Sequence, residues 1–399
     1  MNPSVVFILI TMLLDAMGIG LIVPVMPDLI RDVQGGDLAQ AALWGGVLST
    51  VFAVMQFLFS PLLGSLSDRY GRRPVLLVSM AVMAVDYVIM AIAGSIFWLL
   101  IGRVIGGITA ATGATGNAYM ADISPPEKKA ANFGLIGAAF GLGFVLGPLI
   151  GGLLAQYGTR APFWAAAGLT ALNFVFGYFV LRETVTDKTR RSFSLRRALP
   201  WGALLHVSKL PAIRPLLWVY FIYSVAFYVY PAVWSYFSTE RWGWSPTVIG
   251  LSLALFGITM AVVQGGLIRV LLRYLGDRRT VVAGHVFDMG TFGLIAFIKS
   301  GTLGLILTPI AALGAVITPA LQGVMSRMVP DDAQGELQGV LTSLHALAMI
   351  VAPLMMTSIF AWFIRDDTPI YLPGAPFLLS LVLMGVSLLI FLRGSRGMS

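Results

Sequence analysis

The chain contains no cysteine among its 399 residues and few charged residues of either sign. The lack of cysteine excludes disulfide bonds, thiolate metal ligands and cysteine nucleophiles. Charged side chains make up 11% of the sequence, whereas soluble proteins average about a quarter. The hydrophobic share is 58%, and the mean hydropathy is +0.87. This composition predicts that most of the chain lies in a lipid bilayer.

Several sequence patterns are also missing. The first 25 residues carry no basic segment and no small-residue cleavage pattern, so we expect a retained first membrane helix. No HExxH, GxSxG or Walker sequence occurs, which disfavours an intramembrane enzyme. The net charge is +8, but the basic residues are divided among short loops, which argues against nucleic-acid binding.

Apolar stretches of about twenty residues, the length that a ~30 Å hydrocarbon core requires, recur along the chain. They predict an all-α membrane protein with twelve transmembrane helices in two six-helix bundles, residues 1–181 and 212–399. A cytoplasmic central loop, residues 182–211, is expected to join them. The predicted spans are 4–26, 43–64, 75–94, 97–120, 131–156, 161–181, 212–237, 246–272, 280–298, 302–324, 336–361 and 372–392.

The basic residues are distributed unevenly between the two sets of loops. Twenty lysines and arginines fall on the side that holds both termini, and five fall on the opposite side. The positive-inside rule then predicts that both termini are cytoplasmic.

The two halves share landmarks at a constant offset of 205 residues. An even number of spans in each half makes the halves parallel repeats, an arrangement typical of transporters. The matching pairs are Gly71 with Gly276, Pro125 with Pro330, Gly134 with Gly339, and Pro148 with Pro353.

A short charged turn, residues 64–74, joins the second and third spans. Gly71 permits a tight backbone turn, and Pro74 suits the first turn of a helix. We predict a charge latch that closes the cytoplasmic side, and a solvated loop is the alternative. The predicted members of this cytoplasmic gate are Gly64, Asp68, Arg69, Gly71, Arg72, Arg73 and Asp122.

Three acidic residues, Asp15, Asp86 and Asp288, fall well inside predicted spans. An aspartate at a helix centre costs about 2.5–3.5 kcal/mol on insertion scales, so we interpret these residues as proton carriers. The alternative is that they only cap kinks or pair with a cation. Arg103, inside the fourth span, is the obvious cation, and its removal is predicted to damage transport.

Two histidines lie in predicted spans. His285 is three residues before Asp288 on the same helical face, so the two side chains are predicted to share a proton or a hydrogen bond. A neutral histidine near the interface is the alternative. His345 in the eleventh span is a candidate ligand contact or a packing residue.

The fifth span has glycines at helical spacing and a proline. Small faces allow close helix packing, and Pro148 favours a kink. The run of Gly141, Gly143, Gly147 and Pro148 resembles the glycine-proline motif of antiporters, although close packing alone would explain the glycines.

Buried amides, aromatic rings and a histidine supply the mixture that a polycyclic polar drug requires. Aromatic residues near span ends also form interfacial belts, which is the competing interpretation. The predicted substrate contacts are Gln56, Asn117, Phe227, Tyr228, Gln264, Gln322 and His345.

These patterns together resemble the major facilitator superfamily, and most of all its bacterial drug/proton antiporters of the tetracycline-exporter group (TCR/Tet). One departure is that such exporters commonly carry a histidine in the eighth span, where this chain has Met260. The segments that carry the resemblance are residues 14–20, 55–56, 86–87, 106–109, 140–143, 147–148 and 319–323, with the turn at 64–74.

The resemblance implies proton-coupled efflux of a small amphipathic drug, most of all tetracycline, by alternating access in the bacterial inner membrane. It implies no cofactor and no fixed metal site; a divalent cation is expected to travel with the substrate if a metal chelate is exported. The expected partners are the drug and the lipid bilayer, with no nucleic acid and no obligatory protein partner. The alternatives are a multidrug or metabolite exporter and, from other classes, a channel or an enzyme.

Overall fold

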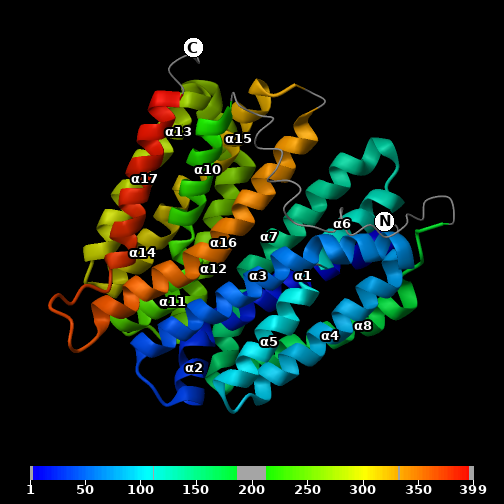
Figure 1. The fold of residues 1–399 in the computed structure, drawn as a ribbon, viewed down its shortest axis with the longest axis horizontal. Helices are drawn as coiled ribbons and strands as arrows, with labels where there is room; N and C mark the ends of the chain where they lie inside the picture. Colours follow the sequence, from blue (N-terminus) through cyan, green and yellow to red (C-terminus); the bar gives the residue numbers. More distant parts are fainter. Residues whose placement is uncertain (1–2, 111, 187–212, 331–332, 395–399) are drawn as a thin grey trace. The chain divides into compact units, whose positions relative to one another are not determined.

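The computed structural model describes residues 3–110, 112–186, 213–330 and 333–394, and every regular element in these ranges is a helix (Figure 1). Most of the predicted central loop, 182–211, lies outside the described residues. In the first half, the helices are α1 (Pro3–Ile22), η1 (Val23–Val25), α2 (Met26–Gln34), α3 (Leu38–Tyr70), α4 (Arg72–Ile92), α5 (Ile96–Thr109), α6 (Thr112–Ile123), η2 (Pro126–Lys128), α7 (Lys129–Leu154), η3 (Ala155–Tyr157) and α8 (Ala161–Val180).

The second half repeats this order. Its helices are α10 (Arg214–Phe227), α11 (Val229–Trp242), α12 (Pro246–Val262), the π-helical η6 (Val263–Leu267), α13 (Ile268–Phe297), α14 (Gly301–Ala311), the 3-10 helix η7 (Ala312–Val316), α15 (Ile317–Met328), α16 (Gln334–Ile364) and α17 (Ala375–Gly394).

Eleven stretches of the described residues are long and apolar enough to cross a membrane. One of them, Pro246–Phe297, has 52 residues, and at 1.5 Å per residue a helix of that length reaches about 78 Å, more than twice a ~30 Å core. The helix breaks at Gly276, whose φ of 71° and ψ of 169° are not helical. This stretch therefore contains two spans, and the predicted twelve-span fold is confirmed.

The internal repeat is visible in the helix boundaries. Helices α7 and α16 begin 205 residues apart, at Lys129 and Gln334, and each contains a proline, Pro148 or Pro353. The offset also relates the break between α5 and α6 to η7, which separates α14 from α15.

Residue contacts divide the chain into two compact units. The first unit comprises Met1–Gly36, Val51–Pro200 and Ser245–Ala254, and the second comprises Asp37–Thr50, Trp201–Trp244 and Leu255–Ser399. The predicted bundles, residues 1–181 and 212–399, instead place Asp37–Thr50 in the first half and Ser245–Ala254 in the second. The predicted domain boundaries stay a prediction.

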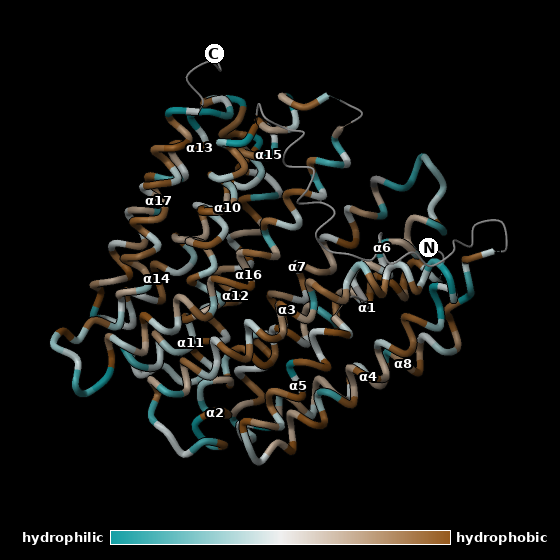
Figure 2. Tube along the Cα trace, viewed as in Figure 1, coloured by the Kyte–Doolittle hydropathy of each residue, from teal (hydrophilic) through white to brown (hydrophobic). Residues whose placement is uncertain are grey.

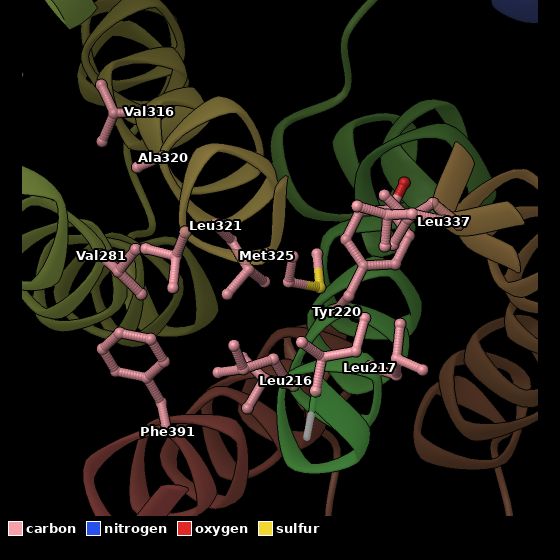
Figure 3. Close-up of a cluster of buried hydrophobic side chains, with 14 of the residues drawn as sticks. Leu216, Leu217, Tyr220, Val281, Val316, Ala320, Leu321, Met325, Leu337 and Phe391 are labelled. Carbon is pink, nitrogen blue, oxygen red and sulfur yellow. The ribbon is translucent and has the colours of Figure 1, made fainter. Parts of the chain in front are cut away.

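Each unit is built on long helix pairs. In the first unit, α1 packs on α7 and α4 packs on α8, and in the second unit α17 packs on α10 and α13. Hydrophobic residues dominate the helices, and hydrophilic residues gather mostly at helix ends and connections (Figure 2). An apolar cluster joins α10, α13, α15, α16 and α17 through side chains that include Leu216, Val281, Met325, Leu337 and Phe391 (Figure 3).

Candidate functional site

The turn between α3 and α4 carries charged side chains gathered around Arg72. Arg72 Nη1 lies 2.5 Å from Asp68 Oδ1, and its Nε donates to Asp122 Oδ2 on α6 at 3.2 Å. Nη1 also donates to Ser67 Oγ at 2.6 Å. The Arg72 side chain is only 13% exposed. One guanidinium thus ties the end of α3 to the end of α6.

Two other charged side chains of the predicted gate, those of Arg69 and Arg73, lie outside this cluster. Arg73 Nη2 donates to Tyr178 O on α8 at 2.8 Å, and the Arg69 guanidinium lies over the Tyr70 ring. A Cβ placed on Gly64 would meet no atom within 4 Å. The structure therefore joins three of the predicted gate residues around the turn and places the remaining charges elsewhere.

Glu183, just beyond the end of α8, completes the turn and was not predicted. Its Oε1 accepts from the backbone N–H of Arg72 at 2.9 Å, and its Oε2 accepts from that of Arg73 at 3.2 Å. These are the first N–H groups of α4, which have no partner within the helix and attract negative charge. Gly71, with φ of 111°, leaves the space that the Glu183 carboxylate fills. The sequence indicates this contact only by placing one acidic residue, Glu183, at the end of an apolar stretch.

Thr184 extends this cluster by donating its hydroxyl to Asp122 Oδ2 at 3.0 Å. Asp122 thus accepts from Arg72 and from Thr184, so the ends of α6 and α8 meet at the same turn.

The second unit holds the corresponding turn at Gly276. Asp277, the first residue after Gly276, forms an ion pair with Arg327 near the end of α15. Asp277 and Arg327 are the positions 205 residues after Arg72 and Asp122, so the ion pair recurs with its charges exchanged.

Within the first unit, Asp86 on α4 faces Arg103 on α5. Arg103 Nη2 lies 3.9 Å from Asp86 Oδ2, and Asp86 is 2% exposed. Among the described residues, neither Asp86 Oδ1 nor Arg103 Nε has a hydrogen-bond partner. The predicted cation therefore pairs with Asp86, while its guanidinium also lies 5.4 Å from the centre of the Phe52 ring.

Asp15 on α1 is half-buried. The hydroxyl of Tyr87, the neighbour of Asp86, lies against Gly18 of α1. Tyr87 therefore joins α4 to α1 beside Asp86, a contact that the sequence did not predict.

Asp288 on α13 is 1% exposed, and its Oδ2 has no hydrogen-bond partner among the described residues. His285 does not provide one. Its Nδ1 lies 2.8 Å from Val281 O and its Nε2 lies 3.0 Å from Ser387 Oγ on α17, so both ring nitrogens are occupied. The predicted hydrogen bond between His285 and Asp288 does not form, because the His285 ring is directed toward α17. That prediction is therefore wrong.

The glycines of the predicted antiporter motif lie on two faces of α7. A Cβ on Gly143 would meet Leu13 O, and one on Gly147 would lie 2.6 Å from Met17 O, so this face packs directly on the α1 backbone. Pro148 lies beside Gly20 of α1. Gly141 faces open space. Close helix packing accounts for Gly143 and Gly147, and the antiport role of the motif stays a prediction.

The predicted substrate contacts differ in their surroundings. Phe227 stacks on Tyr223 with ring centroids 5.7 Å apart, and Gln322 is half-buried on α15. Tyr228 packs against a small apolar cluster of α10 and α16. Gln56 is half-buried, and the side chains of Asn117, Gln264 and His345 are exposed. Gln264 lies in η6, and π-helical turns of this kind are frequent at functional sites.

The chain matches the Major Facilitator Superfamily over residues 8–353. It belongs to that superfamily. It is 42% identical over 360 residues to the tetracycline resistance protein of class C from Escherichia coli, covering 90% of each chain. The class E protein from E. coli is 38% identical over 362 residues, covering 90% of this chain and 89% of its own.

A solved structure supports the same family. The human organic anion transporter MFSD10 is 27% identical, and the match has a TM-score of 0.69 and covers 98% of this chain and 99% of that one. The family and the fold are therefore those of a membrane transporter rather than an enzyme.

Met260 lies where the resemblance led us to expect a histidine. Met260, near the end of α12, is half-buried and packs against the apolar cluster that includes Val281 and Leu321. A thioether in this position contributes packing and no proton chemistry.

Proposed function

We propose that this protein exports tetracycline from the bacterial cytoplasm across the inner membrane in exchange for protons. The observation that carries the proposal is the buried, unpartnered carboxylate of Asp288 in a chain 42% identical to a tetracycline resistance protein. A carboxylate buried in a membrane span without a cation marks a candidate proton site. The identity of the drug rests on the relatives.

The proposed cycle assigns different tasks to the two units. Asp288 binds a proton from outside as the drug is released, and it loses that proton toward the cytoplasm before the next drug molecule binds. Arg103 holds the charge of Asp86, Tyr87 next to Asp86 contacts α1, and Asp15 on α1 supplies a further carboxylate. His285 orders the Asp288 helix through Ser387 on α17.

The proton gradient supplies enough free energy for this exchange. One charge crossing ~100 mV releases about 2.3 kcal/mol, and each pH unit adds about 1.4 kcal/mol. Together they sustain a drug gradient of roughly a hundredfold or more, since a factor of ten corresponds to about 1.4 kcal/mol. If the drug leaves as a monocation, one-for-one exchange is electroneutral and only the pH difference drives it.

We also propose that Asp68, Arg72 and Asp122 form a latch on the cytoplasmic side, with both termini in the cytoplasm. The transporter uses no cofactor, and a divalent cation that accompanies the drug belongs to the substrate. The partners are the drug and the lipid bilayer, and no obligatory protein partner is required.

The test is tetracycline-dependent proton flux in proteoliposomes that contain the full chain. Asp288→Asn is expected to abolish the flux, and Asp15→Asn and Asp86→Asn are expected to reduce it. A channel would dissipate the proton gradient without drug, whereas an antiporter moves protons only when tetracycline is present. If all three substitutions leave the flux and its dependence on acidity unchanged, the proposal is wrong.

Met260 favours a second candidate, a proton-coupled exporter of another amphipathic drug or metabolite. Resistance profiles of cells producing the protein, taken across unrelated drug classes, distinguish the two. Protection against tetracycline alone supports the first candidate. Protection against several classes but not tetracycline supports the second.

A further inference from the structure

The two most deeply buried carboxylates among the described residues, Asp86 and Asp288, both lie against the backbone of a glycine. On the first unit's α5, a Cβ added to Gly106 would lie 2.7 Å from Asp86 Oδ2. On the second unit's η7, a Cβ added to Gly314 would overlap Asp288 Oδ1 and lie 2.8 Å from Oδ2. No methyl group fits at either position while the carboxylate keeps its place.

These contacts differ from the glycine contacts that hold helices together. Gly143 and Gly147 face backbone atoms of α1, so a methyl group there would force two helices apart. Gly106 and Gly314 instead face the end of an aspartate side chain, which can rotate away. A Cβ at these two positions would therefore displace an acidic group without separating helices.

The carboxylates that a Cβ would displace, those of Asp86 and Asp288, make few polar contacts. Asp86 Oδ1 and Asp288 Oδ2 have no hydrogen-bond partner among the described residues. For Asp288, the glycine backbone is therefore the wall that determines where the carboxylate stops. For Asp86, Gly106 bounds Oδ2 on one side and Arg103 attracts the same oxygen. At Gly314 the wall belongs to the 3-10 segment η7, which interrupts the helix between α14 and α15 and packs on α13.

We infer that Gly106 and Gly314 are positioning residues for proton exchange, because each sets the location, and hence the local polarity, of a carboxylate in the proposed cycle: Asp288, which carries the proton, and Asp86, which Arg103 holds. This inference rests on the proposed proton-coupled export. A substitution that moves the carboxylate changes the proton concentration at which it is occupied, since its surroundings determine the relative stability of its charged and neutral forms.

The α13 helix offers two matched controls. Gly284 lies one turn before Asp288, and a Cβ there would lie 2.5 Å from Ile317 Cγ1, so Gly284→Ala crowds the same helix pair without touching the carboxylate. Gly290 faces open space, so Gly290→Ala reports the effect of alanine on the helix alone.

The experiment uses the full chain in proteoliposomes and measures tetracycline-dependent proton flux against pH for Gly314→Ala, Gly106→Ala and both controls. The infrared band of the protonated Asp288 carboxyl group, identified by its loss in Asp288→Asn, is titrated in the same samples. We expect Gly314→Ala to change the proton concentration at half-maximal flux and half-maximal band intensity by about tenfold, the change that ~1.4 kcal/mol produces. Both controls should keep the wild-type midpoints.

A double variant separates positioning from packing. In an Asp288→Asn background, Gly314→Ala is expected to have no further effect on the pH dependence, because the proton-binding group is gone. If Gly314→Ala fails to reach the membrane, Gly106→Ala tests the same inference on Asp86 through the pH dependence of flux.

The outcomes are distinguishable. Wild-type midpoints in both Gly314→Ala and Gly106→Ala, with intact wild-type flux, overturn the inference and leave the proposed function standing. Equal shifts in Gly284→Ala and Gly314→Ala also overturn it, because they indicate a packing effect. Absence of drug-dependent proton flux in the wild-type protein overturns the proposed function and this inference with it.

Discussion

The turns at Gly71 and Gly276 perform the same structural task with opposite charges. In the first, Arg72 follows the glycine and pairs with Asp122; in the second, Asp277 follows the glycine and pairs with Arg327. The offset of 205 residues makes these positions equivalent. The comparison shows that the repeat retains an ion pair between the turn and the span two helices later, and does not retain its polarity.

The exchange of charge has a consequence for the helix that follows each turn. An acidic residue at a helix N-terminus is stabilised by the helix dipole, and a basic one is not. Asp277 satisfies this preference by itself, whereas Arg72 does not. The first unit compensates with Glu183, which accepts from the first N–H groups of α4. A Cβ on Gly276 would meet no atom within 4 Å, so among the described residues no carboxylate takes the place beside Gly276 that Glu183 takes beside Gly71.

The buried acids follow the same division. Asp86 and Arg103 face each other in the first unit, and their equivalents in the second are Thr291 and Thr308. Asp288 has no cation beside it among the described residues, and its equivalent in the first half is Met83. Among the described residues, one unit therefore contains a compensated pair of buried charges, and the other contains a single buried carboxylate, the one we propose as the proton carrier.

The largest expected effect comes from breaking the compensated pair. Arg103→Ala leaves Asp86 buried without its cation, a change that typically costs about 3–5 kcal/mol. We expect a marked loss of thermal stability in detergent and a loss of tetracycline export. Thr308→Ala, at the equivalent position of the second unit, is the matched control and should change stability far less. Full export by Arg103→Ala would contradict this assignment.

A second prediction concerns variants that give the turn at Gly71 the charge order of the turn at Gly276. Asp122→Arg places two guanidinium groups together and is expected to lower export by roughly tenfold, the change that ~1.4 kcal/mol produces. The double variant Arg72→Asp/Asp122→Arg reproduces the polarity of Asp277 and Arg327 and should recover most of this loss. Export rates normalised to the amount of protein in the membrane provide the measurement. A double variant as defective as the single one would show that the polarity itself is required.

A third prediction concerns the compensating carboxylate. Glu183→Gln keeps an oxygen acceptor but removes the charge beside the start of α4, with an expected cost of about 1 kcal/mol. Hydrogen exchange at the amides of Arg72 and Arg73 should become faster, while exchange elsewhere in α4 stays unchanged. Unchanged hydrogen exchange at both amides would show that the charge of Glu183 does not stabilise the start of α4.

The sequence predicted the parts of this comparison that depend on local pattern. Hydropathy located the twelve spans, the constant offset revealed the repeat, and the residues around Gly71 indicated an ion-paired turn that includes Arg72 and Asp122. Each of these signals comes from composition or spacing along the chain. The polarity of the second ion pair was also present in the sequence, but a contact between Asp277 and Arg327 depends on how α13 and α15 pack.

The contacts that were missed or wrong join residues far apart in the chain. Glu183 reaches a backbone N–H group 111 residues away, and no local pattern marks that pairing. His285 has the spacing to meet Asp288, yet its ring bonds to Ser387, 102 residues later, because α17 packs on α13. Helical spacing shows which side chains share a face, and the packing of neighbouring helices decides which contact forms.

The smallest expected effect comes from removing the more exposed of the two ion pairs, Asp277–Arg327, rather than Arg72–Asp122. The Arg327 side chain is 61% exposed, whereas that of Arg72 is 13% exposed. Exposed ion pairs contribute about 0–1 kcal/mol and weaken with salt. Asp277→Asn should therefore lower thermal stability only slightly, and raising the salt concentration should remove the difference from the wild type. Asp122→Asn should retain a larger difference at high salt because Arg72 is shielded from water. An equal, salt-sensitive loss in both variants would mean that the two turns differ only in sign.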